Sequence, residues 1–246
     1  WETIAWTAIL VVALFTRFFM LGARVMSHDE SLHTVFSNNL YQSGNYTHDP
    51  MMHGPILFHM TALSYFLFGV NDFSARVYPA LLGVIIVMFP LLFRRWLGRT
   101  GAMLAGVMLL FSPLLTYYSR YIRHDIPSIL AAMLMFWGAM MYLSGPENQR
   151  RRAHWLYIIA AAMLWNLGSK ETSFIYIAIF GLFLTIYWLV RVVQHYFRID
   201  GYMVFTTMMI GFLLAGVAAL GMIVVLSISL VEYGTLSIRL DFLGEE

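Results

Sequence analysis

The sequence predicts an all-α integral membrane protein with about seven transmembrane helices and two juxtamembrane helices in its first external loop. Composition is the first reason: 60% of the 246 residues are hydrophobic, only 11% are charged and the mean hydropathy is +0.72. Soluble domains carry about 25% charged residues. The second reason is spacing, because apolar stretches long enough to cross about 30 Å of hydrocarbon recur along the chain. The absence of cysteine excludes disulfides and thiolate sites.

The first apolar stretch, Thr3 to Gly22, predicts a permanent membrane anchor, because it lacks the small-residue cleavage site of a signal peptide. Arg17 lies near its end, where a long cationic side chain is expected to reach the interface. Further spans are expected at Arg76–Phe93, Thr100–Tyr118, Ile126–Leu143, His154–Gly168, Thr172–Val190 and Met203–Leu230. Because the sequence begins with Trp1, we expect it to be a piece of a longer chain.

A polar stretch from Ser27 to Pro55 interrupts this apolar pattern and holds Asp29, Glu30, Asp49 and four of the eight histidines. Such groups are costly beside hydrocarbon unless they pair or bind something, so their density here indicates chemistry. Residues 29–41 are expected to form a helix on the membrane surface, because one face carries Leu32, Val35, Phe36 and Leu40.

The topology depends on whether Ile56–Val70 crosses the membrane or lies along the interface. If it crossed, the polar stretch would share a side with the basic loops at 94–100, 144–152 and 191–200. We favour the interfacial arrangement, because eight of the fifteen cationic residues then lie in cytoplasmic loops. It predicts a multi-pass protein of the cytoplasmic (inner) membrane, with a cytoplasmic N-terminus and an external loop at residues 23–75.

This topology gathers the ionisable residues of three loops on the external side. They are His28, Asp29, Glu30, His33, His48, Asp49, His53, Arg120, Arg123, His124, Asp125, Lys170 and Glu171. Carboxylates from different loops with cations between them suit glycosyl transfer from a phosphate-linked donor. One carboxylate can take the proton of the acceptor hydroxyl, and the cations can stabilise the departing phosphate.

Five short motifs then follow in order: HDES, HGP, LFGVNDFSARVYPALLG, SPLLTYYSRYIRHD and LWNLGSKE. In this order the chain, from about residue 10 to residue 190, resembles the N-terminal module of the GT-C class of polytopic glycosyltransferases, which use polyprenyl-phosphate sugars. It is most similar to the protein O-mannosyltransferase and aminoarabinose-transferase branch, and to the dolichyl-phosphate-mannose-type mannosyltransferases. The resemblance implies a single GT-C-like transmembrane module over residues 1–246.

The resemblance also implies roles for individual residues. Asp29, with Glu30 beside it, falls at the position of the catalytic base, and Asp125 falls at that of a second acid. The residues expected to engage the lipid phosphate are Arg120, Arg123 and Lys170. The lysine-proline-proline motif of the family is replaced by His53-Gly54-Pro55, which removes one phosphate-binding cation.

Other interpretations of the same residues stay open. Asp29 and Glu30 could cap the first interfacial helix, with Ser27 as its N-cap. Asp29 and His33 lie four residues apart, which suits either a pair of divalent-metal ligands or a simple hydrogen-bonded pair. The remaining candidate metal ligands are His53 and His124, and His28 and Glu171 complete the candidate site.

The function that these observations favour is glycosyl transfer from a polyprenyl-phosphate donor to an acceptor hydroxyl on the extracytoplasmic side. The partners are the donor, the bilayer and an acceptor that the sequence does not identify. The alternative is a non-catalytic GT-C-like scaffold or accessory subunit among other membrane subunits, suggested by the altered His53 motif and the short chain. A transporter is less well supported, since no internal repeat is visible. The net charge of +2 gives no indication of a nucleic-acid partner.

Overall fold

The computed structural model describes residues 1–47, 52–144, 153–197, 203, 206–217 and 222. The chain divides into two compact units, Trp1–Ala178 and Ile179–Glu246, and each is described by itself. All regular elements of the described residues are helices, which confirms the prediction of an all-α membrane protein. The count of seven spans and the single module over the whole chain stay predictions.

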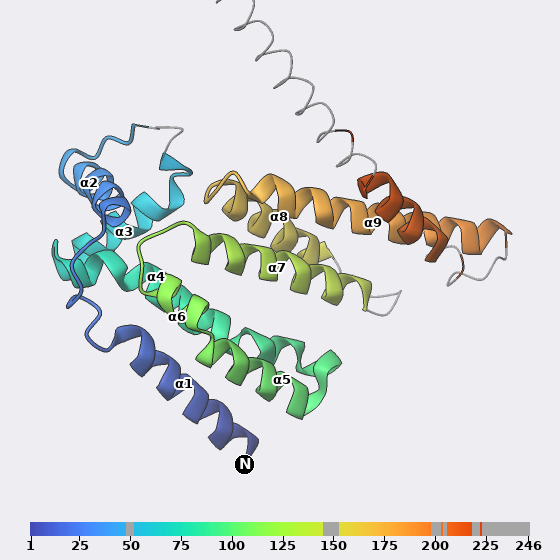
Figure 1. The fold of residues 1–246 in the computed structure, drawn as a ribbon, viewed down its shortest axis with the longest axis horizontal. Coiled ribbons are helices and arrows are strands. Elements are labelled where there is room, and N and C mark those ends of the chain that lie inside the picture. The colour runs from blue at the N-terminus through green and yellow to red at the C-terminus, as the bar shows by residue number, and fades with distance from the viewer. Residues whose placement is uncertain (48–51, 145–152, 198–202, 204–205, 218–221, 223–246) are drawn as a thin grey trace, which may run out of the picture. The chain divides into compact units, whose positions relative to one another are not determined.

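The helices follow the predicted order (Figure 1). They are α1 (Glu2–Phe18), α2 (His28–Ser43), α3 (Ile56–Phe68), α4 (Asp72–Met88), the 3-10 helix η2 (Phe89–Phe93), α5 (Arg94–Phe111), α6 (Pro113–Ser119), α7 (Asp125–Leu143), α8 (Ala153–Leu167) and α9 (Ser173–Phe197). Within the described residues, three stretches are long and apolar enough to cross a membrane: Asp72–Phe111, Asp125–Leu143 and Ser173–His195.

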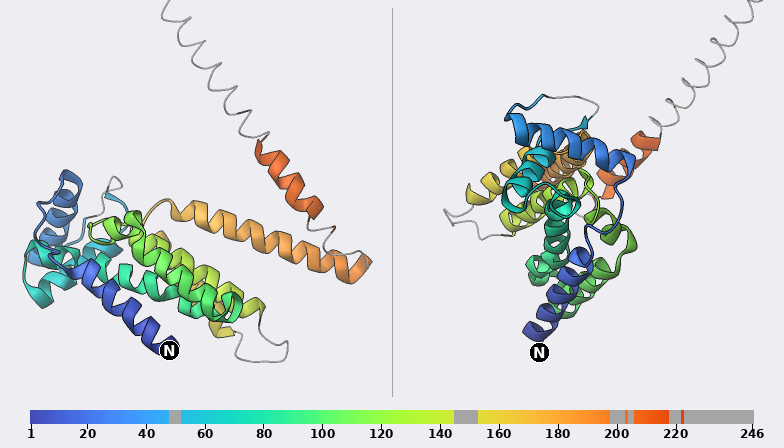
Figure 2. Two further views of the ribbon diagram at one scale, coloured as in Figure 1. Left: turned by 60° about the horizontal axis from the view of Figure 1, so that its bottom comes forward. Right: turned by 90° about the vertical axis from the view of Figure 1, so that its left-hand side faces the viewer.

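Two of these helices, α2 and α3, lie in the predicted external loop and pack together at one end of the first unit (Figures 1 and 2). A capping box begins α2, in which the Ser27 hydroxyl accepts from the Glu30 backbone N–H and the Glu30 carboxylate accepts from that of Ser27. Gly44, with a left-handed φ of 69°, ends it. The 13 residues of α3 span about 20 Å, less than the hydrocarbon thickness, which suits an interfacial position.

The segment predicted as a basic connection, residues 94–100, is assigned to the start of α5, but the helical geometry breaks inside it at Gly98. Asp72–Phe111 is a run of 40 residues that consists of α4, η2 and α5. Gly98 interrupts this run with φ 69° and ψ 177°. Glycine tolerates a positive φ because it has no Cβ. The chain can therefore turn at Gly98, between the helical segments on either side.

Arg17 of α1 is fully buried, so the prediction that it reaches the interface is wrong. Its guanidinium donates to the carbonyl oxygens of Leu110, at 3.1 Å, and Leu109, at 3.3 Å. These carbonyls belong to the last turn of α5, which ends before Pro113 and leaves them without partners in their own helix. Arg17 therefore satisfies the end of a neighbouring helix instead of reaching solvent.

The apolar core of the first unit lies between α1, α4, α5, α6 and α7. Its buried members include Leu82, Ile86, Leu110, Ile122 and Ile126. Ile122 belongs to the connection between α6 and α7 and is fully buried in this core. The polar residues on either side of Ile122 are thereby placed beside the start of α2.

The second unit is helical at residues 179–197 and 206–217. Most of its described side chains are exposed, and Ile186 and Val190 are buried. The predicted span Met203–Leu230 is described only in part, so its full length lies outside the described residues.

Candidate functional site

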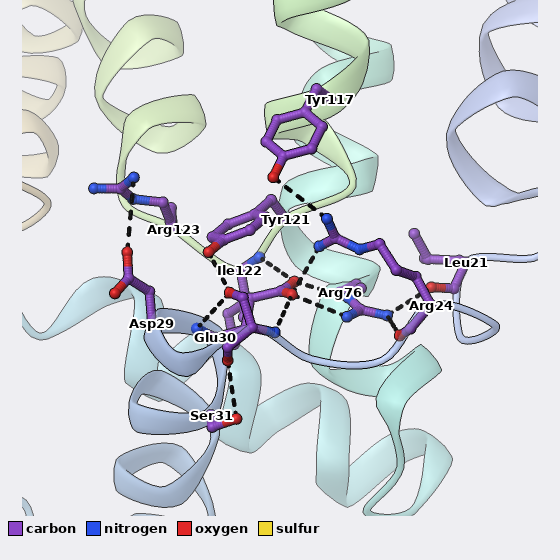
Figure 3. Close-up of polar contacts among 11 residues, drawn as sticks. Leu21, Arg24, Asp29, Glu30, Ser31, Arg76, Tyr117, Tyr121, Ile122 and Arg123 are labelled. Carbon is purple, nitrogen blue, oxygen red and sulfur yellow. Dashed lines mark hydrogen bonds and ion pairs between the residues drawn. The ribbon is translucent and has the colours of Figure 1, made fainter.

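The Glu30 carboxylate is the most heavily hydrogen-bonded group at the external-loop end of the first unit (Figure 3). It is fully buried, as is the guanidinium of Arg76 that faces it. Glu30 accepts from Arg76 Nε at 2.9 Å and Nη2 at 3.1 Å, from Arg24 Nη2 at 2.7 Å, and from the backbone N–H groups of Ser27 at 3.2 Å and Ile122 at 3.4 Å. So many donors hold the carboxylate firmly in place.

Arg76 extends this network to the segment between α1 and α2. Its Nη1 donates to the carbonyl oxygens of Leu21, at 3.0 Å, and Arg24, at 2.9 Å. Arg76 stands at the start of a predicted span and had no predicted role. The sequence did contain one signal for a role of Arg76: an arginine in an apolar segment is costly, so it requires a partner. That partner, Glu30, lies 46 residues earlier, so no local pattern could identify it.

Two tyrosines, Tyr117 and Tyr121, belong to the same network. The hydroxyl groups of Ser27 and Tyr121 hydrogen-bond to each other. The Arg24 guanidinium lies over the rings of Tyr117 and Tyr121, at 5.4 and 5.0 Å from their centroids. The capping role suggested for Ser27 and Glu30 is therefore confirmed, and it is one part of a larger anchor that joins α2, α4 and the α6–α7 connection.

A second group of charged residues lies beside this anchor and consists of Asp29, Arg123, Asp125 and Lys170. Arg123 Nη1 lies 4.0 Å from Asp29 Oδ2, and its Nε lies 3.3 Å from Asp125 Oδ2. Lys170 Nζ donates to Asp125 Oδ1 at 2.6 Å. The Asp29 side chain is 54% exposed, compared with 28% for Asp125 and 17% for Lys170. Asp29 is thus the most accessible carboxylate of the four-residue group.

The structure separates several other predicted site residues from this group. Arg120 donates to the carbonyl oxygens of Thr16, at 2.8 Å, and Met20, at 3.3 Å, at the end of α1. Glu30 is engaged in the buried anchor, and the exposed His28 begins α2. His48 and Asp49 lie outside the described residues.

The His53-Gly54-Pro55 motif is held against the connection between α8 and α9. Backbone N–H groups of Gly54 and Ile56 donate to the carbonyl oxygens of Ser169, at 3.2 Å, and Gly168, at 3.1 Å. A Cβ on Gly54 would collide with the Gly168 carbonyl, so glycine permits this close approach. The pairing places His53 Nδ1 at 2.6 Å from a carboxylate oxygen of Glu171.

Three histidines form a ring cluster behind the charged group. The His124 ring centroid lies 5.1 Å from that of His33 and 5.2 Å from that of His53. His124 and His33 are buried, and neither ring nitrogen of His124 has a hydrogen-bond partner in the described part of the chain. Burial, reinforced by neighbouring positive groups, lowers the pKa of His33 to about 4 and that of His124 to about 2. Both imidazoles are therefore neutral at pH 7.

The metal interpretation of Asp29, His33, His53 and His124 stays a prediction. The carboxylate of Asp29 faces Arg123, and Nδ1 of His53 faces Glu171. Among the described residues, no group of three His, Asp or Glu side chains is arranged so that it could hold a metal ion. The ionisable groups that the structure describes at this end of the molecule include the carboxylates of Asp29, Asp125 and Glu171, the cations of Arg123 and Lys170, and the three-histidine cluster.

The chain is similar to known proteins. The family model described as dolichyl-phosphate-mannose-protein mannosyltransferase matches residues 52–214. An uncharacterized protein of Aquifex aeolicus (strain VF5) is 28% identical over 165 residues, which cover 63% of this chain and 32% of that protein.

Two crystal structures share the fold. ArnT from Cupriavidus metallidurans bound to undecaprenyl phosphate superposes with a TM-score of 0.65 and 24% identity, over 86% of this chain and 41% of ArnT. ArnT in the apo state gives a TM-score of 0.63 and 22% identity, over 83% and 40% of the two chains. The chain thus spans less than half the length of each of these relatives.

Proposed function

Since the chain belongs to the dolichyl-phosphate-mannose-protein mannosyltransferase family, we propose that it is a membrane glycosyltransferase module that uses a polyprenyl-phosphate sugar. The sugar is transferred to an acceptor hydroxyl on the extracytoplasmic side of the cytoplasmic membrane. The observation that carries the proposal is the accessible carboxylate of Asp29 beside the Arg123, Asp125 and Lys170 charges.

Asp29 is the proposed general base. Its carboxylate is more exposed than that of Asp125, and the facing Arg123 nitrogen is 4.0 Å away, so its oxygens can accept a proton from an approaching hydroxyl. Asp125 is less available as a base, because Lys170 at 2.6 Å and Arg123 at 3.3 Å already occupy its two oxygens. Glu30 is less available still, because it is buried and its oxygens are occupied by donors.

Arg123 and Lys170 are the proposed partners of the donor phosphate. In the transfer, the bond between the acceptor oxygen and the anomeric carbon forms while the bond between that carbon and the phosphate oxygen breaks. The acceptor proton goes to Asp29, and polyprenyl phosphate leaves with the bonding electrons. Cations beside the leaving group stabilise the charge that develops on it. Asp125 holds both cations in position before the donor arrives.

A lipid-linked donor is supported over a nucleotide sugar. The ArnT structure that shares the fold is bound to undecaprenyl phosphate. The chain has no Gly-rich turn between a strand and a helix of the kind that binds dinucleotides, and helices alone make up the regular structure of the described residues. An apolar bundle with cations at one end offers what a prenyl chain and its phosphate require.

Direct binding tests the enzyme proposal. Purified protein should bind a polyprenyl-phosphate sugar, and replacing Asp29, Arg123 or Lys170 by alanine should abolish cellular function. If the protein binds no such lipid and all three variants support normal function, the non-catalytic scaffold is the better explanation.

The sidedness can be tested with single cysteines, because the chain has none of its own. Val25 lies in the proposed external loop and is exposed, whereas the exposed Arg99 lies in a proposed cytoplasmic connection. A membrane-impermeant thiol reagent should label Val25→Cys on intact cells and Arg99→Cys only after permeabilisation. Labelling in the opposite order would place the site in the cytoplasm.

A further inference from the structure

We propose that a pocket between α1, α5 and α6 binds the phosphate headgroup of an anionic membrane phospholipid, at a site separate from the donor site. The pocket has a volume of about 490 Å³. Its lining residues are Thr16, Leu21, Arg24, Leu110, Phe111, Pro113, Thr116, Tyr117 and Arg120. None of Asp29, Arg123, Asp125 and Lys170 lines it, which separates it from the group proposed to hold the donor.

The charge around this pocket is unbalanced. Glu30 is the acid of this region, and it pairs with Arg24 and Arg76. In the described part of the chain neither Arg17 nor Arg120 has a carboxylate within 4.0 Å. Four guanidinium groups therefore share one carboxylate at the edge of an apolar bundle. Such an excess of buried or half-buried positive charge is costly unless an anion compensates it.

Hydrogen-bond capacity is available at the same place. Arg120 donates one bond from Nη1 to Thr16 and one from Nη2 to Met20, whereas a guanidinium carries five N–H donors. Arg24 donates to Glu30 at 2.7 Å and to the Tyr117 hydroxyl at 3.4 Å. Both arginines line the pocket, so a phosphate oxygen entering it can accept from either. Burial and the neighbouring Arg24 and Arg76 lower the pKa of Arg120, as expected for a cation that lacks a counter-ion.

The surface beside the pocket suits the acyl chains of a phospholipid. Phe19, Met20, Phe111 and Leu114 are exposed apolar side chains of the α1 end and the α5–α6 junction. In a membrane-spanning bundle such residues face hydrocarbon, while arginines at the helix ends lie at headgroup depth. A phosphodiester could then reach Arg24 and Arg120 from the bilayer while its chains lie against this apolar surface. Charge and apolar surface together favour a phospholipid over a free anion.

The site would also be coupled to the anchor of the proposed active site, because Arg24 belongs to both. Its guanidinium faces the pocket and donates to Glu30, which holds the start of α2 next to Asp29. A phospholipid phosphate on Arg24 would therefore help to order that segment.

Native mass spectrometry of the purified full chain tests the proposal with phosphatidylglycerol as the probe and zwitterionic phosphatidylcholine as the comparison. We expect retained phosphatidylglycerol on the unmodified protein and at least a tenfold weaker affinity for Arg120→Gln, which corresponds to about 1.4 kcal/mol. Arg99→Gln is the matched control, because this exposed arginine pairs with Glu2 and does not line the pocket. Its lipid retention should equal that of the unmodified chain.

Arg120→Gln also removes the bonds from Arg120 to α1, which support the bundle. A second variant therefore tests the pocket with these bonds in place. Thr116 lines the pocket, and Thr116→Glu would place a carboxylate next to the arginines. This variant should lose phosphatidylglycerol while its melting temperature stays at or above that of the unmodified protein. Normal phosphatidylglycerol binding by folded Arg120→Gln and Thr116→Glu would overturn the proposal.

Competition distinguishes the sources of the phosphate. Displacement of the bound phospholipid by equimolar undecaprenyl phosphate would assign the pocket to the prenyl lipid, and displacement by millimolar inorganic phosphate would assign it to a free anion; either result overturns the proposal. Donor binding to the unmodified protein is a separate measurement. If the unmodified protein does not bind the donor, the proposed enzyme function is wrong, and the phosphatidylglycerol result is unaffected.

Discussion

Glu30 and Arg76 form a fully buried, two-pronged ion pair, with Arg76 Nε 2.9 Å from Oε1 and Nη2 3.1 Å from Oε2 of the carboxylate. The pair joins the first turn of α2 to the first turns of α4. Arg76 also binds the carbonyl oxygens of Leu21 and Arg24, so one side chain organises the whole segment between α1 and α2. Asp29 stands next to this pair, which gives the proposed base a rigid support.

Replacing Glu30 by glutamine should strongly destabilise the protein. The substitution leaves the buried Arg76 guanidinium without its counter-charge, and breaking a buried ion pair from one side typically costs about 3–5 kcal/mol. The melting temperature of the purified variant is the measurement. Asp29→Asn is the control, since Asp29 is exposed and its removal should change the melting temperature little. Equal melting temperatures for Glu30→Gln and the unmodified protein would contradict a stabilising role for the pair.

Asp29→Asn should instead lower turnover by roughly 100- to 10,000-fold while donor binding is retained, because the variant loses a general base and keeps the cations. A radiolabelled polyprenyl-phosphate sugar and a separate donor-binding measurement distinguish the two effects. Near-normal transfer by the variant would move the base to Asp125 or another group.

Arg123→Ala should weaken donor binding more than acceptor binding, since Arg123 is proposed to contact the lipid phosphate. Loss of a hydrogen bond to a charged group costs about 1.5–3 kcal/mol, which corresponds to roughly a 10- to 150-fold weaker affinity. Arg95→Ala is a suitable comparison, because Arg95 packs on Trp96 in a predicted cytoplasmic segment. An equal loss of affinity for donor and acceptor would argue against a phosphate contact.

The stability of the protein should fall as the pH drops from 6.5 toward 4. Burial lowers the pKa of His33 to about 4 from its ordinary value of 6.5. Above pH 6.5 the imidazole is neutral in both the folded and unfolded states, so stability does not depend on it. Between pH 6.5 and 4 the unfolded chain binds a proton that the folded protein excludes, and the free energy of unfolding decreases. His124 is buried in the same cluster, and its lower pKa acts in the same direction.

Melting temperatures measured between pH 7.5 and 4.5 check this prediction. His33→Phe should show a shallower decline, because the phenyl ring has no proton to exclude. The exposed His28 provides the control, and His28→Gln should follow the unmodified protein. If His33→Phe loses stability as steeply as the unmodified protein, the decline has another cause.

The helices of this protein could be predicted from the sequence because their signals are local. Apolar runs of sufficient length mark α4, α5, α7 and α9, and the Ser27 and Glu30 side chains that cap α2 lie three residues apart. The resemblance to the GT-C class also depends on short motifs in a fixed order, and the family match confirms it. Asp29, Arg123, Asp125 and Lys170 could be proposed as one group because each stands in a polar break between apolar runs.

The partners of the arginines were decided by the tertiary structure alone. Arg17 was expected at the interface and instead satisfies the end of α5, while Arg76 pairs with an acid 46 residues away. Arg120 and Arg123 lie three positions apart, yet one binds the end of α1 and the other faces Asp29 and Asp125. A long cationic side chain binds whichever carbonyl or carboxylate packing brings near it. Packing depends on contacts between helices far apart in the chain, so no local pattern could assign these partners.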